Sequence, residues 1–252
     1  MALIEQQLAL LDQLEKANSK SLADVLQAAA ISMAVQFRQT RLSNMPAISA
    51  LPSINTELRK IWTAAIAGST EIFMTEFAEG FPQSKATPIQ IIETFISAYR
   101  QGAAQQILDT TQRQVRALMA GGLAAGQSAD AVYSELLEKM PEISSIRSLL
   151  ITRTEVHAAT QFASWQLARR SVIPLVKVWN ATPDDKTRDF GQLGKISQFN
   201  HRVMDGKKVG INAPFSIPRI VGGFEQLMFP GDPHGSAGNV INCRCIQTYE
   251  RA

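Results

Sequence analysis

The stretch SVIPLVKVWNATP at residues 171–183 decides the fold, because the composition of the chain changes there. An apolar run from Val172 to Val178 leads into Trp179 and is followed by a proline-containing turn. From residue 171 onward lie 9 of the 15 glycines and 6 of the 11 prolines. Since glycine and proline break helices and set turns, this third of the chain is predicted to form loops and short strands, with Trp179 in the core of a strand.

The residues that precede this stretch are predicted to be helical. Apolar residues recur there at helical spacing, and the low aromatic content of 7% also favours helix over sheet. Met45–Ser53, with two prolines, is predicted to be a linker. The predicted helices span residues 4–14, 22–42, 54–79, 87–120, 128–139 and 141–170.

Several residue types mark the ends of these helices. Thr87-Pro88-Ile89-Gln90 has the pattern of an N-terminal capping box with proline at the first helical position. Gly121-Gly122 is predicted to end that helix, Ser128 to cap the next one, and Pro141 to begin the last. The chain is therefore predicted to be an α+β protein. A helical body would span residues 1–140, and a module would span residues 141–252, with a connecting helix over 141–170 and a turn-rich part over 171–252.

Overall composition limits the class of protein. The chain has 252 residues, is 45% hydrophobic and carries a net charge of +3, which suits a globular protein. No dense basic run marks a dedicated nucleic-acid binder, no apolar stretch is long enough to span a bilayer, and the N-terminal residues do not resemble a signal peptide. Two cysteines cannot form a secreted disulfide framework, so we expect folding in a reducing cytoplasm.

Cys243 and Cys245 are the strongest candidates for chemistry. In a strand, residues two apart point to the same side, so both sulfurs would face one point. Zinc binds thiolates and imidazole in tetrahedral geometry, and His201 could be a third ligand, with Asp232 or His234 as a fourth. The alternative is that both cysteines are small buried hydrophobic residues.

Four pieces of sequence occur in a defined order in the last hundred residues. The first is Arg153-Thr154-Glu155 on a predicted helix, and the second is WNATPDDKTR at residues 179–188. The third is His201 with Asp205-Gly206 and Phe215 after it. The fourth is FPGDP at residues 229–233, leading to INCRC at residues 241–245. In these pieces the chain resembles the Mu F-like phage head morphogenesis family, although Asp189 to Asn200 looks like an inserted loop relative to the family pattern.

This resemblance implies a structural role rather than an enzymatic one. Members of the family are minor head proteins near the portal vertex that act in head assembly and, in some cases, in DNA packaging or ejection. The implied partners are therefore the portal protein, a major capsid or scaffold protein, and packaged DNA through non-specific contact. No membrane partner is implied. The implied location is the virion head, and the host bacterial cytoplasm during assembly.

The motif residues also have plain structural interpretations. Asp184 and Arg188 are four residues apart and could pair on one face of a helical turn. Arg153 and Glu155 could link the last helix to the turn-rich part. Asp232 would belong to the Pro-Gly-Asp-Pro turn, and His157 would be a partly buried polar residue.

Two other functions remain open at this stage. His201, Cys243 and Asp185 could form a Cys-His-Asp hydrolase or a metal-assisted nuclease. Residues 1–140 could instead be an effector or toxin fused to a Mu F-like module. No nucleophile elbow, HExxH, P-loop or GxGxxG motif supports an enzyme.

Overall fold

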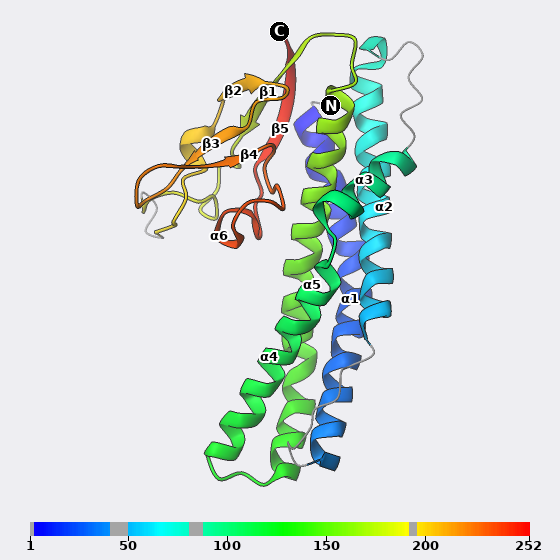
Figure 1. Cartoon of the computed structure of the whole chain (residues 1–252), viewed down its shortest axis with the longest axis vertical. Helices are drawn as coiled ribbons and strands as arrows, with labels where there is room; N and C mark the ends of the chain where they lie inside the picture. The colour runs from blue at the N-terminus through cyan, green and yellow to red at the C-terminus, as the bar shows by residue number, and fades with distance from the viewer. Residues whose placement is uncertain (1–2, 41–49, 81–87, 192–195) are drawn as a thin grey trace. The chain divides into compact units, whose positions relative to one another are not determined.

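The computed structural model describes residues 3–40, 50–80, 88–191 and 196–252, and it has the predicted α+β fold (Figure 1). The helical part comes first and the strands follow. The elements in chain order are α1 (Leu3–Thr40), α2 (Leu51–Glu76), η1 (Ala78–Gly80), α3 (Pro88–Tyr99), α4 (Ala103–Ala124), α5 (Ala129–Ala168), β1 (Leu175–Asn180), η2 (Arg202–Met204), β2 (Lys208–Gly210), β3 (Phe215–Pro218), β4 (Phe224–Leu227), α6 (Ala237–Val240) and β5 (Ile246–Arg251).

The chain divides into two compact units, each built from separated stretches of sequence. One, which we call the site unit, contains residues 1–15, 61–101 and 153–252; the other, the helical unit, contains residues 16–60 and 102–152. The boundary predicted after residue 140 falls inside α5. Long helices contribute to both units, so a division read along the sequence does not coincide with the division by contacts.

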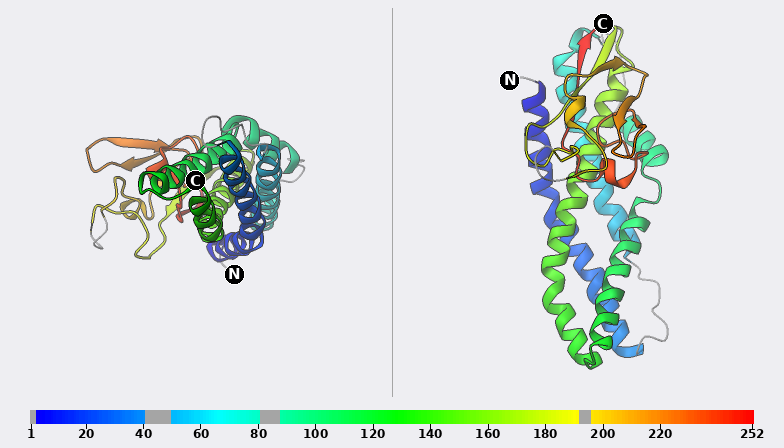
Figure 2. Two further views of the ribbon diagram at one scale, coloured as in Figure 1. Left: turned by 90° about the horizontal axis from the view of Figure 1, so that it is seen from below. Right: turned by 90° about the vertical axis from the view of Figure 1, so that its left-hand side faces the viewer.

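The helical unit consists of segments of α1, α2, α4 and α5 that lie side by side (Figure 1, Figure 2). Each segment buries one apolar face, and Arg38 adds an ion pair with Asp130 at 2.7 Å and a cation–π contact with Tyr133. No helix in the described part of the chain is both long and apolar enough to cross a membrane. The buried apolar residues include Leu22, Leu26, Met33, Phe37, Ile54, Leu58, Ile107, Val115, Met119, Val132 and Leu136.

Two predicted helix breaks are absent. The helices predicted at 4–14 and 22–42 are one helix, α1, because the residues between them include neither glycine nor proline. Pro141 does not begin a helix, since α5 continues through it. A proline inside a helix costs about 3 kcal/mol, and the buried residues Met140 and Ser144 on either side of it indicate that packing offsets this cost.

Two other breaks lie where they were not predicted. The helix predicted over 87–120 is interrupted after Tyr99, because Gly102 adopts a left-handed φ of 81° before α4. Gly121-Gly122 does not end α4, which continues to Ala124 and is followed by Gly126 at φ 80°.

The Ser128 cap is confirmed, since its Oγ accepts a hydrogen bond from the Ala131 amide at 3.1 Å. The Thr87 cap and most of the Met45–Ser53 linker lie outside the described residues.

The described residues of the site unit form two small antiparallel sheets. The first has the strand order β2-β1-β5, with Val178 of β1 opposite Lys208 and Thr248; the second is the hairpin β3-β4, with Ser216 opposite Gln226. These strands confirm the prediction for the turn-rich part, and the completely buried Trp179 lies in β1 as expected.

An aromatic cluster and a second apolar cluster lie among the described residues of the site unit. The aromatic cluster joins the helices of this unit to the FPGDP turn, with Phe162 at 5.1 Å from Phe95 and 6.0 Å from Phe229 between ring centroids. The second cluster lies among the strands and loops and is made of Trp179, Phe199, Met204, Phe215, Ile217, Leu227, Val240, Cys243 and Cys245. Both cysteines are therefore part of a core.

Lys177 in β1 gives a pH-dependent prediction. Its ammonium group is buried, donates to the Met228 carbonyl at 2.7 Å and lies 5.0 Å from the centre of the Phe215 ring. Burial lowers the pKa of Lys177 to about 8 from 10.5, with Asp232 opposing the shift. Between pH 8 and pH 10.5, Lys177 is protonated in the unfolded chain but largely deprotonated in the folded chain. The free energy of unfolding that Lys177 contributes therefore rises with pH across this range.

We therefore expect the free energy of unfolding of the wild type, measured in urea, to increase relative to that of Lys177→Met between pH 8 and pH 10. Subtracting the variant removes the contribution of every other titrating group. A difference that stays flat across this range would contradict the assignment.

Candidate metal centre

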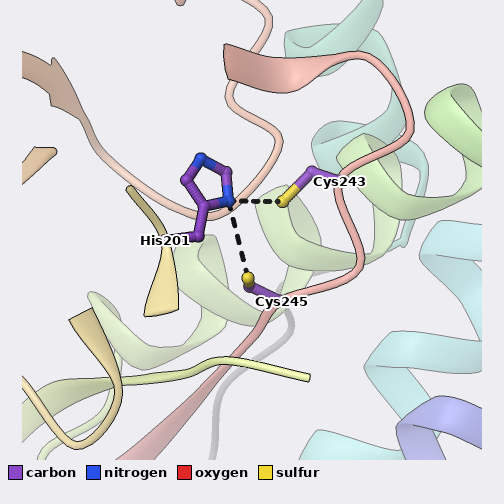
Figure 3. A group of neighbouring side chains, drawn as sticks. All are labelled: His201, Cys243 and Cys245. Atoms are coloured by element: carbon purple, nitrogen blue, oxygen red, sulfur yellow. Dashed lines mark hydrogen bonds between the residues drawn. The ribbon is translucent and has the colours of Figure 1, made fainter. Parts of the chain in front are cut away.

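The three residues proposed as metal ligands from the sequence meet in the site unit (Figure 3). His201 directly precedes η2, and its Nδ1 lies 3.6 Å from the Cys243 sulfur and 3.5 Å from the Cys245 sulfur. The three candidate ligand atoms all lie within 4.8 Å of one another, and the three side chains are at most 2% exposed. This buried cluster could hold a metal ion.

The two sulfurs converge for a different reason than the predicted one. Cys243 and Cys245 do not belong to a strand but to the segment between α6 and β5. Asn242 adopts a left-handed φ of 58°, and the Cys243 amide donates to the Val240 carbonyl at 3.1 Å. A turn around Asn242, which is a residue type that tolerates this conformation, therefore brings the sulfurs together.

The spacing of the cluster suits a tetrahedral zinc ion. Zinc lies about 2.3 Å from sulfur and about 2.0–2.1 Å from imidazole nitrogen, which places a tetrahedral pair of such ligands about 3.6 Å apart. The observed nitrogen–sulfur distances are 3.5 and 3.6 Å. Within the described part of the chain, no fourth His, Cys, Asp or Glu joins the cluster.

The surroundings of the two thiols shift their pKa values in opposite directions. The pKa of Cys243 lies well below its ordinary value, chiefly because Cys245 donates a hydrogen bond to it and secondly because of His201, while burial opposes the shift. The pKa of Cys245 lies well above its ordinary value because Cys245 keeps the proton that it donates, and burial adds to this. The indole of the completely buried Trp179 opposes this rise in the pKa of Cys245.

The second ring nitrogen of His201 faces a residue that the sequence did not single out. His201 Nε2 lies 2.6 Å from Asn239 Oδ1, and the Asn239 amide nitrogen in turn donates to Glu225. Asn239 is completely buried. None of the sequence pieces described above includes Asn239, so its contact with His201 follows from the structure alone.

Neither residue predicted as a fourth ligand reaches the cluster. The Asp232 carboxylate accepts the amides of Met228 at 2.9 Å and His234 at 3.1 Å, so it closes the FPGDP turn instead. The side chain of His234 is 59% exposed. Gly231 of this turn has φ 77°, and a Cβ there would lie 2.4 Å from the His157 ring, so the turn requires glycine.

Asp184 and Arg188 hold the cysteine segment rather than pairing with each other. Asp184 accepts the amides of Lys186 and Thr187 at 3.0 Å each and forms an ion pair with Arg244, which lies between the two cysteines. Arg188 donates to the Gly238 carbonyl at 2.7 Å and to the Ile241 carbonyl. The Arg188 carbonyl also accepts the His201 amide at 2.9 Å. Arg188 therefore connects the histidine and cysteine parts of the cluster.

We expect Arg188→Met to lower the free energy of unfolding by about 1–3 kcal/mol, because it removes charge-assisted hydrogen bonds to two carbonyls. The matched control is Arg116→Met on the exposed face of α4, where a change within about 0.5 kcal/mol is expected. Urea unfolding measures both variants. Equal effects would show that Arg188 does not hold the cysteine segment.

Of the predicted pair Arg153 and Glu155, only Arg153 reaches the turn-rich part. It donates to Asn242 Oδ1 at 2.9 Å and binds Glu15 through two nitrogens at 2.6 and 2.7 Å. Glu155 is buried and accepts from the Trp62 indole at 2.9 Å and from Arg100. The pair thus connects α5 both to the cysteine segment and to other helices of the site unit.

His157 is buried rather than partly buried, and it contacts the cysteine segment directly. Its Nε2 donates to the Cys245 carbonyl at 2.6 Å. Gln161, one helical turn later, accepts from the Gln247 amide at 2.8 Å. One face of α5 therefore holds the chain at Cys245 and at Gln247, and the helical spacing of His157 and Gln161 was the available signal in the sequence.

The Cys-His-Asp arrangement considered from the sequence does not form. Asp185 is exposed, and the ring nitrogens of His201 face the two sulfurs and Asn239. A pocket of about 220 Å³ does lie next to Cys243. Its lining is made of Leu8, Leu11, Asp12, Glu15, Arg153, Val156, His157, Thr182, Cys243 and Arg244.

The fold and the cluster define an α+β protein with a buried histidine–dicysteine centre. No family model matches the chain. The chain is 31% identical over 110 residues to the uncharacterized protein YqbB of Bacillus subtilis (strain 168), a match that covers 44% of this chain and 32% of YqbB. The match thus spans about a third of the length of that curated relative. No solved structure matches the chain.

Proposed function

We propose that this protein is a phage minor head protein that acts in head assembly near the portal vertex. The observation that carries the proposal is the convergence of the four sequence pieces that resemble the Mu F-like family. Arg153 bonds Asn242, Asp184 pairs with Arg244, Arg188 binds the Gly238 and Ile241 carbonyls, and the Trp179 ring meets that of His201 at 5.3 Å. Residues that lie far apart in the sequence thus bind the same segment, which carries Cys243 and Cys245.

The helical unit offers a surface on which a partner could dock. Ile146, Leu149 and Leu150 of α5 are 61%, 40% and 38% exposed, and their spacing places them on one face of the helix. An apolar stripe of this kind suits packing against a helix of the portal, capsid or scaffold protein. The strand-bearing third of the chain carries the net positive charge, which would favour weak, salt-dependent contact with packaged DNA.

Co-expression with the portal protein of the same phage tests this role. We expect the chain to co-purify with the portal ring in a small fixed number of copies, countable by native mass spectrometry. Ile146→Glu should weaken the complex while leaving the fold intact, and Glu142→Gln on the same helix serves as the control. A portal ring that never retains the chain would overturn the proposal.

We further propose that zinc occupies the His201, Cys243 and Cys245 cluster and acts as a structural staple. The nitrogen–sulfur spacings support this, as does the choice of ligands, because thiolates and imidazole favour zinc over magnesium or calcium. Elemental analysis of protein purified without chelators should find one zinc per chain. The double variant Cys243→Ser/Cys245→Ser should contain none, and zinc-free wild-type protein would reject the staple.

A further inference from the structure

We infer that Asn239 and Glu225 form a positioning layer that holds His201 with Nδ1 unprotonated and directed at the two cysteine sulfurs. The inference rests on the proposed zinc site and adds the residues that prepare it. Neither residue belongs to the motif pieces by which the sequence resembles a known family.

The first step is the orientation of the Asn239 side-chain amide. Glu225 Oε2 accepts a hydrogen bond from Asn239 Nδ2 and one from Ser236 Oγ at 3.0 Å. Glu225 Oε1 accepts a hydrogen bond from the Ser236 backbone N–H at 2.8 Å. An ionised carboxylate only accepts hydrogen bonds, so the nitrogen of the Asn239 side chain must face Glu225. Its oxygen is thereby turned toward His201.

The second step is the tautomer of the imidazole. Asn239 Oδ1 can only accept, and it lies 2.6 Å from His201 Nε2, so the proton of neutral His201 must be on Nε2. Nδ1 then carries a free lone pair. That lone pair faces the sulfurs of Cys243 and Cys245 at 3.6 and 3.5 Å.

The third step is that water is excluded from these hydrogen bonds. Asn239 is 0% exposed and His201 is 1% exposed, so water does not readily replace the bond between their side chains. The His201 ring also packs edge-on against Trp179, with 83° between the ring planes. Acceptors behind a metal-binding histidine fix its orientation, and losing one typically weakens metal binding by about 10–100-fold.

Zinc affinity tests the layer directly in the full-length protein. By competition with a chromophoric chelator, Asn239→Leu should bind zinc about 10–100-fold more weakly than the wild type, with one site per chain retained. Glu225→Leu should also weaken zinc binding, because the Asn239 side chain then loses the acceptor that orients its nitrogen away from His201. Asn180→Leu is the matched control, because it removes hydrogen bonds to Thr248 and Ile246 within the same unit without reaching His201.

A second measurement does not depend on metal. Long-range ¹H–¹⁵N NMR correlations of the metal-free protein should show His201 protonated at Nε2 in the wild type and a tautomer mixture in Asn239→Leu. A wild-type protein protonated at Nδ1, or an Asn239→Leu variant with undiminished zinc affinity, overturns the layer. The Nε2 tautomer in a protein that binds no zinc would reject the zinc proposal but support the positioning by Asn239.

Discussion

Replacing Glu155 by alanine is expected to lower the free energy of unfolding by about 3–5 kcal/mol, because the change leaves a charge without its partner inside the site unit. The Glu155 side chain is 4% exposed and that of Arg100 is 17% exposed. Glu155 also accepts the Trp62 indole N–H at 2.9 Å. Removing Glu155 therefore takes away the partner of the Arg100 guanidinium and the acceptor of the Trp62 indole N–H at the same time.

The matched control lies on the same helix. Glu135 pairs with Lys139 on α5, but their side chains are 39% and 52% exposed, so Glu135→Ala should lower the free energy of unfolding far less than Glu155→Ala. The double variant Arg100→Met/Glu155→Leu should recover part of the loss, because it removes both charges. Chemical denaturation measures all three variants. A single Glu155→Ala cost below that of Glu135→Ala would refute the buried pair as a stabilising contact.

The sequence predicts the class of the fold because that class depends on local composition. The change at residue 171 separates helices from strands, and the burial of Trp179 follows from the apolar run before it. Helix ends were harder to predict, since they depend on packing. Pro141 lies within α5 and Gly121-Gly122 within α4, so neither ends a helix. Gly102 and Gly126, which have positive φ angles, lie instead just before and just after α4.

The candidate site was predicted where the chemistry of a residue type is specific, and missed where position decides. Histidine and cysteine have few roles when buried together, so His201, Cys243 and Cys245 could be named. Asp232 was an equally suitable ligand by type, but it closes its own turn. Asn239 acts only through the place that α6 gives it, which no spacing in the sequence reveals.

Adding zinc to the metal-free protein is expected to raise its stability by about 4 kcal/mol when free zinc reaches about 1,000 times the dissociation constant. The unfolded chain cannot bring His201 and Cys243, 42 residues apart, to one point without losing conformational freedom, so binding favours the folded state. Urea unfolding at several zinc concentrations should show a midpoint that climbs steadily. Magnesium should have no such effect, since it prefers oxygen ligands.

The double variant Cys243→Ser/Cys245→Ser separates the ion from the packing of the two side chains. Both cysteines belong to the apolar cluster that lies among the strands and loops, so the variant should be less stable even without metal. Its midpoint should nevertheless be the same at every zinc concentration, and that flat response is the decisive comparison. If the midpoints of the wild type were equally flat, the cluster would be two buried thiols beside a histidine. The Arg188 and Asp184 contacts would then hold the cysteine segment without help from an ion.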